Sequence, residues 1–348
     1  MDGLAQSQRR ALLHLLLGTA CCVLLLEGVL RIPSIAGHFE QIKFNEVALK
    51  NRALDEDQRR GKPPPALLAF GTSRTGVAFV PATVATELRL AYRGFNLGIS
   101  SGPILVHRFW LEQYLRRHGV PRLVLLEVPV FSLSRNFHDD TDQYYRSVAE
   151  DQPLVFTTGV LSAPVPLEMK SEILLSTVFN FYRYRAYLGP LTLQKAWTAP
   201  RSPHNDRTYE DGWFKGAPLL TAEQRQRQLS EYRGKVLADY DVNLSEIRAF
   251  LAYAREQGIP VALVQWPVSR TLQDLYDELR IYPRYVQAIG RLQDDYRVPF
   301  INLHDLFPDT RDRTELFLDI HHLNPRGAEA MSKALARSLQ EMPAIPPP

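Results

Sequence analysis

The sequence has little cysteine, little net charge and only one long hydrophobic run. Two of its 348 residues are cysteine, and these are the adjacent Cys21 and Cys22. Neighbouring cysteines are poorly placed to bridge each other, so the rest of the chain has neither a disulfide nor a cysteine-based metal site. Lysine and arginine number 41 against 38 aspartates and glutamates. With so small an excess and no basic run, nucleic acid is not expected as a partner.

The overall composition is that of a globular protein. Hydrophobic residues make up 45% of the chain and charged residues 23%. These values exclude a disordered chain, a collagen and a disulfide-stapled mini-protein. The length allows one large domain or two small ones, each with enough material for a core.

The hydrophobic run covers residues 11–30 and follows Arg9 and Arg10. Twenty helical residues span about 30 Å, the thickness of the hydrocarbon core of a bilayer. We therefore expect residues 1–36 to form a cytoplasmic tip and a single transmembrane anchor. The two arginines place the N-terminus in the cytoplasm and everything after Leu30 outside. Three alternatives remain: a cleaved signal peptide ending near residues 34–36, a lipoprotein modified at Cys21, and a buried core helix.

The remainder of the chain predicts an α/β fold. Residues 37–65 are polar and indicate a stalk or a first covering helix, which stops at three consecutive prolines. Apolar runs then alternate with amphipathic stretches, which is typical of a doubly wound, mostly parallel sheet of five strands in a three-layer sandwich. The predicted strands are 66–70, 94–97, 122–128, 260–265 and 298–303, and the predicted helices are 103–118, 242–257, 272–293 and 325–340.

Two segments depart from this alternation, one inside the predicted domain at 66–342 and one after it. Residues 131–240 are rich in aromatic and turn-forming residues, so we interpret them as a large insertion between the third and fourth strands. Because the insertion starts at the carboxyl end of a strand, where ligand sites form in such sheets, we expect it to cover the site. Residues 343–348 are predicted to be a loose tail.

The candidate site combines residues that follow different strands. Ser73 comes after the first predicted strand, and Asp319 and His322 come after the fifth. A serine hydroxyl is a weak nucleophile that needs an adjacent base, which itself needs an orienting group, and these three residues could supply those roles. The backbone N–H groups of Ser73 and Gly98 could bind an oxyanion. Taken singly, Ser73 could be a helix cap, Asp319 a turn former, and His321 could replace His322 as the base.

These motifs resemble those of the SGNH (GDSL-type) hydrolase superfamily. The resemblance rests on Gly-x-Ser at 71–73, Gly98, and Asp-x-x-His-Leu-Asn-x-x-Gly at 319–327. With the N-terminal anchor, the chain is similar to membrane-anchored bacterial members such as the D-alanyl transfer protein of teichoic-acid modification and the alginate O-acetylation proteins. The resemblance implies a periplasmic serine esterase or O-acyltransferase that works through an acyl-serine, without a metal or cofactor. Its expected substrate is an acyl ester of an envelope glycan or polymer, and an expected partner is a membrane acyltransferase.

One position departs from the family pattern. The third family block normally supplies an asparagine to the oxyanion hole, and Pro129 stands about there in this chain. Proline has no N–H and no side-chain donor, so we consider Arg74 and Gln265 as auxiliary donors. The departure also leaves open a catalytically weak or inactive module that binds a glycan or recruits an acyltransferase. A purely structural envelope protein is a third possibility.

The alternatives to this interpretation are a metal site and two other enzyme classes. His304, Asp305, Asp319, His321 and His322 are suitable ligand types, but nothing in the sequence fixes their geometry. No glycine-rich phosphate loop occurs. Residue 75 is threonine, so Ser73 is not in the Gly-x-Ser-x-Gly elbow of α/β-hydrolases.

Overall fold

The computed structural model describes ten ranges of the chain. They are residues 2–42, 46–89, 93–100, 102–134, 167–185, 188, 211–213, 219–237, 242–307 and 315–342. Contacts within the chain define two compact units, one made of Met1–Asn45 with Ala149–Thr208 and the other of Glu46–Val148 with Tyr209–Pro348. The predicted tail at 343–348 and much of the predicted insertion lie outside the described residues.

The second unit is built on a five-stranded parallel sheet. Its strands are β1 (Leu67–Gly71), β2 (Gly94–Gly98), β3 (Leu123–Glu127), β4 (Val261–Gln265) and β5 (Phe300–Asn302). Their order is β2-β1-β3-β4-β5, and every pairing between them is parallel. This confirms the predicted fold class and gives the flavodoxin-like strand order. In that order the topological switch point, where ligands bind, lies between β1 and β3.

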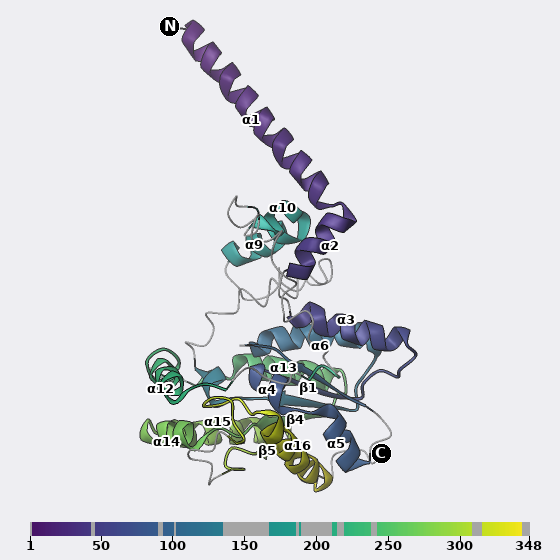
Figure 1. Ribbon diagram of the computed structural model, residues 1–348, viewed down its shortest axis with the longest axis vertical. Helices are drawn as coiled ribbons and strands as arrows, with labels where there is room; N and C mark the ends of the chain where they lie inside the picture. Colours follow the sequence, from purple (N-terminus) through teal and green to yellow (C-terminus); the bar gives the residue numbers. More distant parts are fainter. Residues whose placement is uncertain are drawn as a thin grey trace. The chain divides into compact units, whose positions relative to one another are not determined.

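Helices cover both faces of this sheet. On one side α6 (Ile104–His118) packs against α13 (Ser245–Glu256), close to α3 (Glu46–Arg59). On the other side α4 (Ser73–Ala78) and α5 (Pro81–Leu88) pack against α16 (Pro325–Gln340) (Figure 1). All residues of β1 to β4 are buried, which explains why these strands are apolar without alternation.

The predicted single helix over 272–293 is wrong. The chain forms two helices there, α14 (Arg270–Glu278) and α15 (Ile281–Tyr296). Arg280 adopts a left-handed conformation with φ of 51°, which interrupts the helical path between them. Pro283 accounts for the break, because it has no N–H to donate to the Leu279 carbonyl and its ring would clash with that carbonyl in a continuous helix. The hydrophobic pattern alone favoured one continuous helix. The other described elements of this unit are η1 (Val130–Leu133), α12 (Ala222–Glu231) and η4 (Tyr232–Val236).

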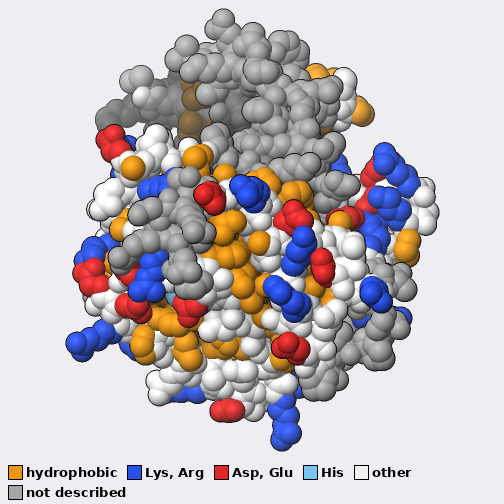
Figure 2. Space-filling view, turned by 60° about the horizontal axis from the view of Figure 1, so that its bottom comes forward, with side chains coloured by type: hydrophobic (Ala, Val, Ile, Leu, Met, Phe, Trp, Pro, Cys, Tyr) orange, Lys and Arg blue, Asp and Glu red, His pale blue; other side chains and the backbone are white. Residues whose placement is uncertain are grey.

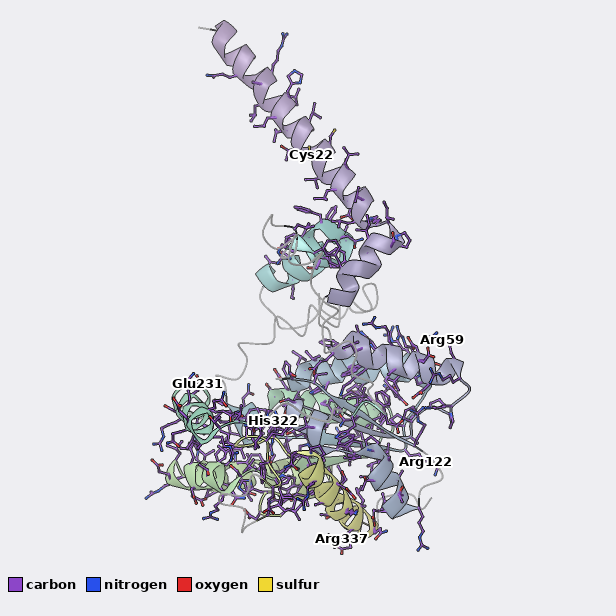
Figure 3. The ribbon with its side chains drawn as sticks, viewed as in Figure 1. Cys22, Arg59, Arg122, Glu231, His322 and Arg337 are labelled. Atoms are coloured by element: carbon purple, nitrogen blue, oxygen red, sulfur yellow. The ribbon has the colours of Figure 1, made fainter. Side chains whose placement is uncertain are left out.

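The first unit contains α1 (Asp2–Leu30), α2 (Pro33–Ile42), α9 (Leu167–Val178) and α10 (Asn180–Arg183). The segment Arg10–Leu30 of α1 is long and apolar enough to cross a membrane, and it is almost entirely exposed. Cys22 lies on this helix as a free, exposed thiol (Figure 3). The one carboxylate of the segment, Glu27, accepts hydrogen bonds from the Asn180 and Phe181 N–H groups at the start of α10. These contacts compensate for a charge in an otherwise apolar run.

The visible surface carries charges of both signs. On the face shown in Figure 2, lysine, arginine, aspartate and glutamate side chains are interspersed around exposed hydrophobic ones. Neither sign forms a continuous field among the side chains described on this face.

Candidate functional site

Ser73 lies at the carboxyl end of β1, beside the switch point. Thr72 is the N-cap of α4, and its side chain accepts a hydrogen bond from the Arg74 N–H at 3.2 Å. Ser73 is therefore the first residue of α4, held directly above the end of the strand. Gly71 permits this turn because a Cβ there would lie 2.1 Å from Thr75 Oγ1.

The loop that carries Asp319 and His322 is fixed at both ends. Asn324 caps α16 by accepting the Gly327 N–H at 3.0 Å, and its side-chain amide donates to the Glu315 carbonyl at 2.8 Å. Within the loop the Leu318 N–H donates to the His322 carbonyl at 2.8 Å. The Ser269 N–H, which follows β4, donates to the Ile320 carbonyl at 3.1 Å. These bonds hold the loop against the carboxyl edge of the sheet.

The structure places Ser73, His322 and Asp319 in one hydrogen-bonded series. His322 Nε2 lies 2.7 Å from Ser73 Oγ, and His322 Nδ1 lies 2.6 Å from Asp319 Oδ2. The His322 side chain is 21% exposed, so solvent and small molecules reach the series. His322 is seen beside the end of the sheet near α4 in Figure 3. Since a hydroxyl, an imidazole and a carboxylate are in contact, a proton can pass from serine to histidine.

Asp319 is held as an anion. Burial alone raises the pKa of the Asp319 carboxyl. The neighbouring His321 and His322 and their hydrogen bonds together lower this pKa by more than burial raises it, so it lies below its usual range. Asp319 Oδ1 accepts the backbone N–H groups of His321 and His322 at 2.8 and 2.7 Å. Gln228 of α12 donates to Asp319 Oδ2 at 3.3 Å. The carboxylate is thus oriented by the loop itself and by a helix within the predicted insertion.

His321 points into the protein, unlike His322. It is buried, and its ring lies 5.2 Å from that of Tyr232 and 6.3 Å from that of Phe131. Burial lowers the pKa of His321 to about 3, and the adjacent His322 lowers it as well. His321 is therefore neutral, and it is His322 that meets Ser73.

The expected oxyanion donors differ in their availability. The Ser73 N–H is at the first position of a helix, so it has no acceptor within α4. The Gly98 N–H donates to Asn96 Oδ1 at 2.9 Å. It is therefore engaged inside the protein, which does not agree with the role predicted for it. Gly98 supplies close packing instead, because a Cβ on it would lie 2.3 Å from the Gly76 nitrogen.

The two auxiliary donors predicted to replace the missing asparagine are committed elsewhere. Arg74 is buried, donates to the Trp266 carbonyl at 2.5 Å and lies 3.6 Å from Glu127 Oε1. Gln265 is fully buried, donates to the Trp266 carbonyl at 2.8 Å and has its Oε1 3.4 Å from the Tyr285 hydroxyl. Pro129 precedes η1 in extended conformation and adds no donor.

Part of the alternative metal cluster does gather. Within the described residues, Asp319, His321 and His322 offer ligand atoms within 4.8 Å of one another. His304 and Asp305 are not in this group, and the His304 ring is stacked on Tyr282 at 4.0 Å. Since both ring nitrogens of His322 are already hydrogen-bonded, a metal there would have to displace the contact with Ser73 or Asp319.

Three polar residues near the site escaped the sequence interpretation. Glu127 and Lys50 are buried, and Lys50 Nζ donates to the Asn96 carbonyl at 3.0 Å. Glu127 did leave a signal, because it is the only charged residue in the apolar run 123–128. Gln228 left none, since it lies in a helix that is polar throughout.

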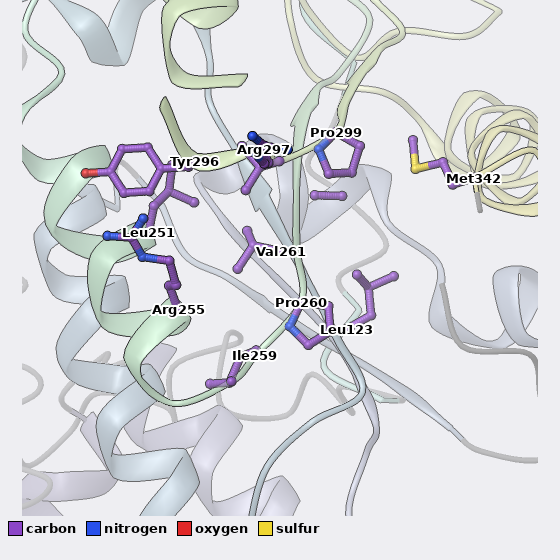
Figure 4. Close-up of a pocket in the computed structure, with 13 residues that line it drawn as sticks. Leu123, Leu251, Arg255, Ile259, Pro260, Val261, Tyr296, Arg297, Pro299 and Met342 are labelled. Atoms are coloured by element: carbon purple, nitrogen blue, oxygen red, sulfur yellow. The ribbon is translucent and has the colours of Figure 1, made fainter. Parts of the chain in front are cut away.

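A cavity lies at the end of the sheet opposite to Ser73. It has a volume of about 270 Å³ and is lined at the amino ends of the strands by residues such as Leu123, Pro260 and Pro299 (Figure 4). Arg255 and Tyr296 lie at its side, with the guanidinium 5.3 Å from the ring centre. It shares no lining residue with the Ser73 site.

Comparisons with known proteins find distant likeness only. A protein-family model matches residues 219–343, which is less than half of the chain. No curated protein matches the sequence.

Several solved structures share part of the arrangement. The chain is similar to a protein from Slackia heliotrinireducens assigned to the SGNH hydrolases, with 13% identity, 78% of this chain and 97% of the other covered, and a TM-score of 0.35. It is similar to an aryl esterase from M. smegmatis (12%, 79% and 98%, 0.34) and to Est24, a carbohydrate acetylesterase from Sinorhizobium meliloti (11%, 79% and 98%, 0.34). At these TM-scores the likeness establishes neither an activity nor a substrate for this chain.

Proposed function

We propose that the chain is a serine esterase or O-acyltransferase, with Ser73 as nucleophile, His322 as base and Asp319 as the group that orients the base. The observation that carries the proposal is the pair of contacts at His322, 2.7 Å to the Ser73 hydroxyl and 2.6 Å to the Asp319 carboxylate. Three side chains of these types in this series form the arrangement that activates a serine for acyl transfer.

The geometry at His322 supports the following proton transfers. Asp319 is ionised, so the proton between it and His322 resides on Nδ1, which leaves Nε2 free to accept the Ser73 proton. Ser73 Oγ then bonds to the acyl carbonyl carbon. His322 passes the proton to the departing alkoxide as the ester bond breaks. Water or an acceptor hydroxyl next attacks the acyl-serine and gives its proton to His322. His322 returns this proton to Ser73 Oγ as the bond between Ser73 and the acyl group breaks, which restores the serine.

The Ser73 N–H donates a hydrogen bond to the oxyanion that develops on the substrate. This donor is fixed by the Thr72 cap at the start of α4. Loss of one oxyanion donor typically lowers the rate by ~10²–10³. A site with one backbone donor and no asparagine is therefore expected to turn over generic esters slowly, unless the substrate brings a further donor.

The location of the enzyme is part of the proposal. The exposed apolar segment Arg10–Leu30 supports a single-pass anchor, and Arg9 and Arg10 support an N-terminus in the cytoplasm. The α/β unit then faces the periplasm of a bacterial cell. On this basis we propose an acyl ester of an envelope glycan or polymer as substrate, with a membrane acyltransferase as a partner.

A second candidate is a catalytically weak module that binds a glycan or recruits an acyltransferase. The engagement of the Gly98 N–H with Asn96 and the burial of Arg74 and Gln265 favour it, because they leave one oxyanion donor. This candidate keeps the fold and the contacts of Ser73 but needs no turnover.

Labelling with a fluorophosphonate separates the two candidates. The full-length protein in detergent is expected to incorporate one phosphonyl group per chain at Ser73, and the Ser73→Ala variant none. Hydrolysis of 4-nitrophenyl acetate by the parent is expected to exceed that by the variant at least ~10³-fold. Equal hydrolysis by both proteins would contradict the serine mechanism. Absence of labelling at Ser73 in the folded protein would favour the second candidate.

A further inference from the structure

We infer that Glu127 is a positioning residue whose carboxylate holds the turn that carries Ser73. The inference rests on the proposed function, because the turn matters for rate only if Ser73 is the nucleophile. Glu127 is the last residue of β3, and its side chain is fully buried. Its place on the strand beside β1 brings the carboxylate under the turn at residues 71–75.

One carboxylate oxygen binds both sides of Ser73. Glu127 Oε2 accepts the Thr72 N–H at 2.7 Å and the Thr72 hydroxyl at 3.0 Å. The same oxygen accepts the Thr75 hydroxyl at 2.7 Å and the Thr75 N–H at 3.3 Å. The residue before the nucleophile and the residue two positions after it are thus tied to one point. Ser73 lies between these attachments and has little freedom to move.

Arg74 and Thr75 link the turn to the end of β4. Arg74 Nη1 lies 3.6 Å from Glu127 Oε1, and Arg74 Nη2 donates to the Trp266 carbonyl. The Trp266 indole N–H donates in turn to the Thr75 hydroxyl at 2.7 Å. The Thr75 hydroxyl therefore accepts from Trp266 and donates to Glu127. The network of Glu127, Thr75, Arg74 and Trp266 connects the ends of three adjacent strands beneath Ser73.

The alternative is that the buried carboxylate of Glu127 contributes to the stability of the fold but not to the reactivity of Ser73. In that case substitutions in the network would lower stability and leave the reactivity of the folded protein unchanged. Charge-assisted hydrogen bonds to a buried carboxylate are strong and directional, so their loss is instead expected to shift the Ser73 hydroxyl from His322 Nε2. A misplacement of about 1 Å in a catalytic group can reduce the rate ~10²-fold.

Thr75 offers a matched pair of variants. Thr75→Val keeps the volume but removes the hydroxyl that joins Glu127 to Trp266, whereas Thr75→Ser keeps that hydroxyl. Glu127→Gln keeps the shape of the side chain but removes the charge that faces Arg74. Leu339→Ala is the stability control, because Leu339 is buried in the core in the last turn of α16, at the end of that helix opposite to the Asn324 cap.

The test measures kcat and KM for 4-nitrophenyl acetate, the rate of phosphonyl labelling, and Tm. Thr75→Val and Glu127→Gln are expected to lower kcat and the labelling rate by about 10- to 100-fold, with KM within about two-fold of the parent. Thr75→Ser is expected to retain at least about a third of the parent kcat. Leu339→Ala is expected to lower Tm while kcat at 25 °C stays that of the parent. Parent-like kcat in Thr75→Val and Glu127→Gln would overturn the inference.

Failure of the proposed function gives a different result. If the parent shows no more labelling and hydrolysis than Ser73→Ala, the serine mechanism is lost, but the hold on the turn is still testable by amide hydrogen exchange. Faster exchange at Thr72 and Thr75 in Glu127→Gln, relative to the Leu339→Ala control, supports the hold that Glu127 has on the turn. Exchange equal to that of the parent contradicts it.

Discussion

Gly71→Ala tests how tightly the turn before Ser73 is packed. A Cβ at this position would lie 2.1 Å from Thr75 Oγ1, 2.4 Å from Glu127 Oε2 and 2.5 Å from Glu127 Cβ. All three distances are far below van der Waals contact. The obstructing atoms are buried and hydrogen-bonded, so they cannot rotate into solvent. The new methyl group must therefore push the carboxylate of Glu127 away from the turn.

The expected cost follows from these contacts. Overpacking a buried position typically costs ~1–3 kcal/mol. Displacing Glu127 Oε2 also leaves a buried donor such as the Thr72 N–H without its acceptor, which costs another ~1–3 kcal/mol. A total of ~3 kcal/mol corresponds to a decrease in Tm of about 6–12 °C for a domain of this size. Because the displaced atoms flank Ser73, kcat is expected to fall as well.

Gly290→Ala is the matched control. Gly290 lies in α15, and a Cβ there has no atom within 4 Å. Replacing a helical glycine by alanine is expected to stabilise the protein by ~0.5–1 kcal/mol. Thermal unfolding of the two variants in the same detergent should therefore move Tm in opposite directions. A Gly71→Ala protein with the Tm and kcat of the parent would refute the reasoning.

Three further predictions concern Asp319, His107 and Lys50. Asp319→Asn is expected to lower kcat by ~10⁴ with KM little changed, because the amide stabilises the wrong His322 tautomer; a decrease below ten-fold in steady-state assays would count against the assigned role. Burial lowers the pKa of His107 to about 3. Between pH 6.5 and 3 only the unfolded chain then binds this proton, so the free energy of unfolding decreases by up to ~1.4 kcal/mol for each unit by which the pH is lowered. Urea titrations of His107→Leu should show a weaker dependence of stability on pH. Burial lowers the pKa of Lys50 to about 7, although Glu46 raises it. Stability should accordingly rise between pH 7 and 10, and an unchanged slope in Lys50→Met would exclude this cause.

The sheet could be predicted because burial leaves a direct trace in the sequence. Each strand predicted as an apolar run lies within two residues of its observed position, for example 94–97 against Gly94–Gly98. The helix that closes the fold was predicted from Asn324 and Pro325, which form its cap and first turn, and it begins as expected. The break at Arg280 did have a signal in the sequence, Pro283, which lacks the N–H that a continuous helix would bond to the Leu279 carbonyl, but the hydrophobic pattern continues through it and favoured one helix.

The sequence could predict those features of the candidate site that depend on residue type, but not those that depend on the distances between groups. The contact between Ser73, Asp319 and His322 was expected because a hydroxyl, a carboxylate and an imidazole follow strand ends, and the structure does bring them together. The oxyanion role of Gly98 could not be judged from the sequence, because it depends on whether the side chain two residues earlier accepts its N–H. The same is true of Arg74, which is adjacent to Ser73 in the chain but faces Glu127 and Trp266.

The meeting of Ser73 and His322 depends on how the chain returns from the far edge of the sheet. In the order β2-β1-β3-β4-β5, three strand spacings of about 4.8 Å separate β5 from β1, or roughly 14 Å. The segment after β5 must cross this distance before His322 can reach Ser73. The Ile320 carbonyl is bonded after β4, and α16 packs on α4 and α5, which flank β1 and β2. The packing of α16 on the β1 side therefore draws the loop across the sheet edge. Weakening the contact between α16 and α4 should therefore move His322 away from Ser73 even though neither residue is changed.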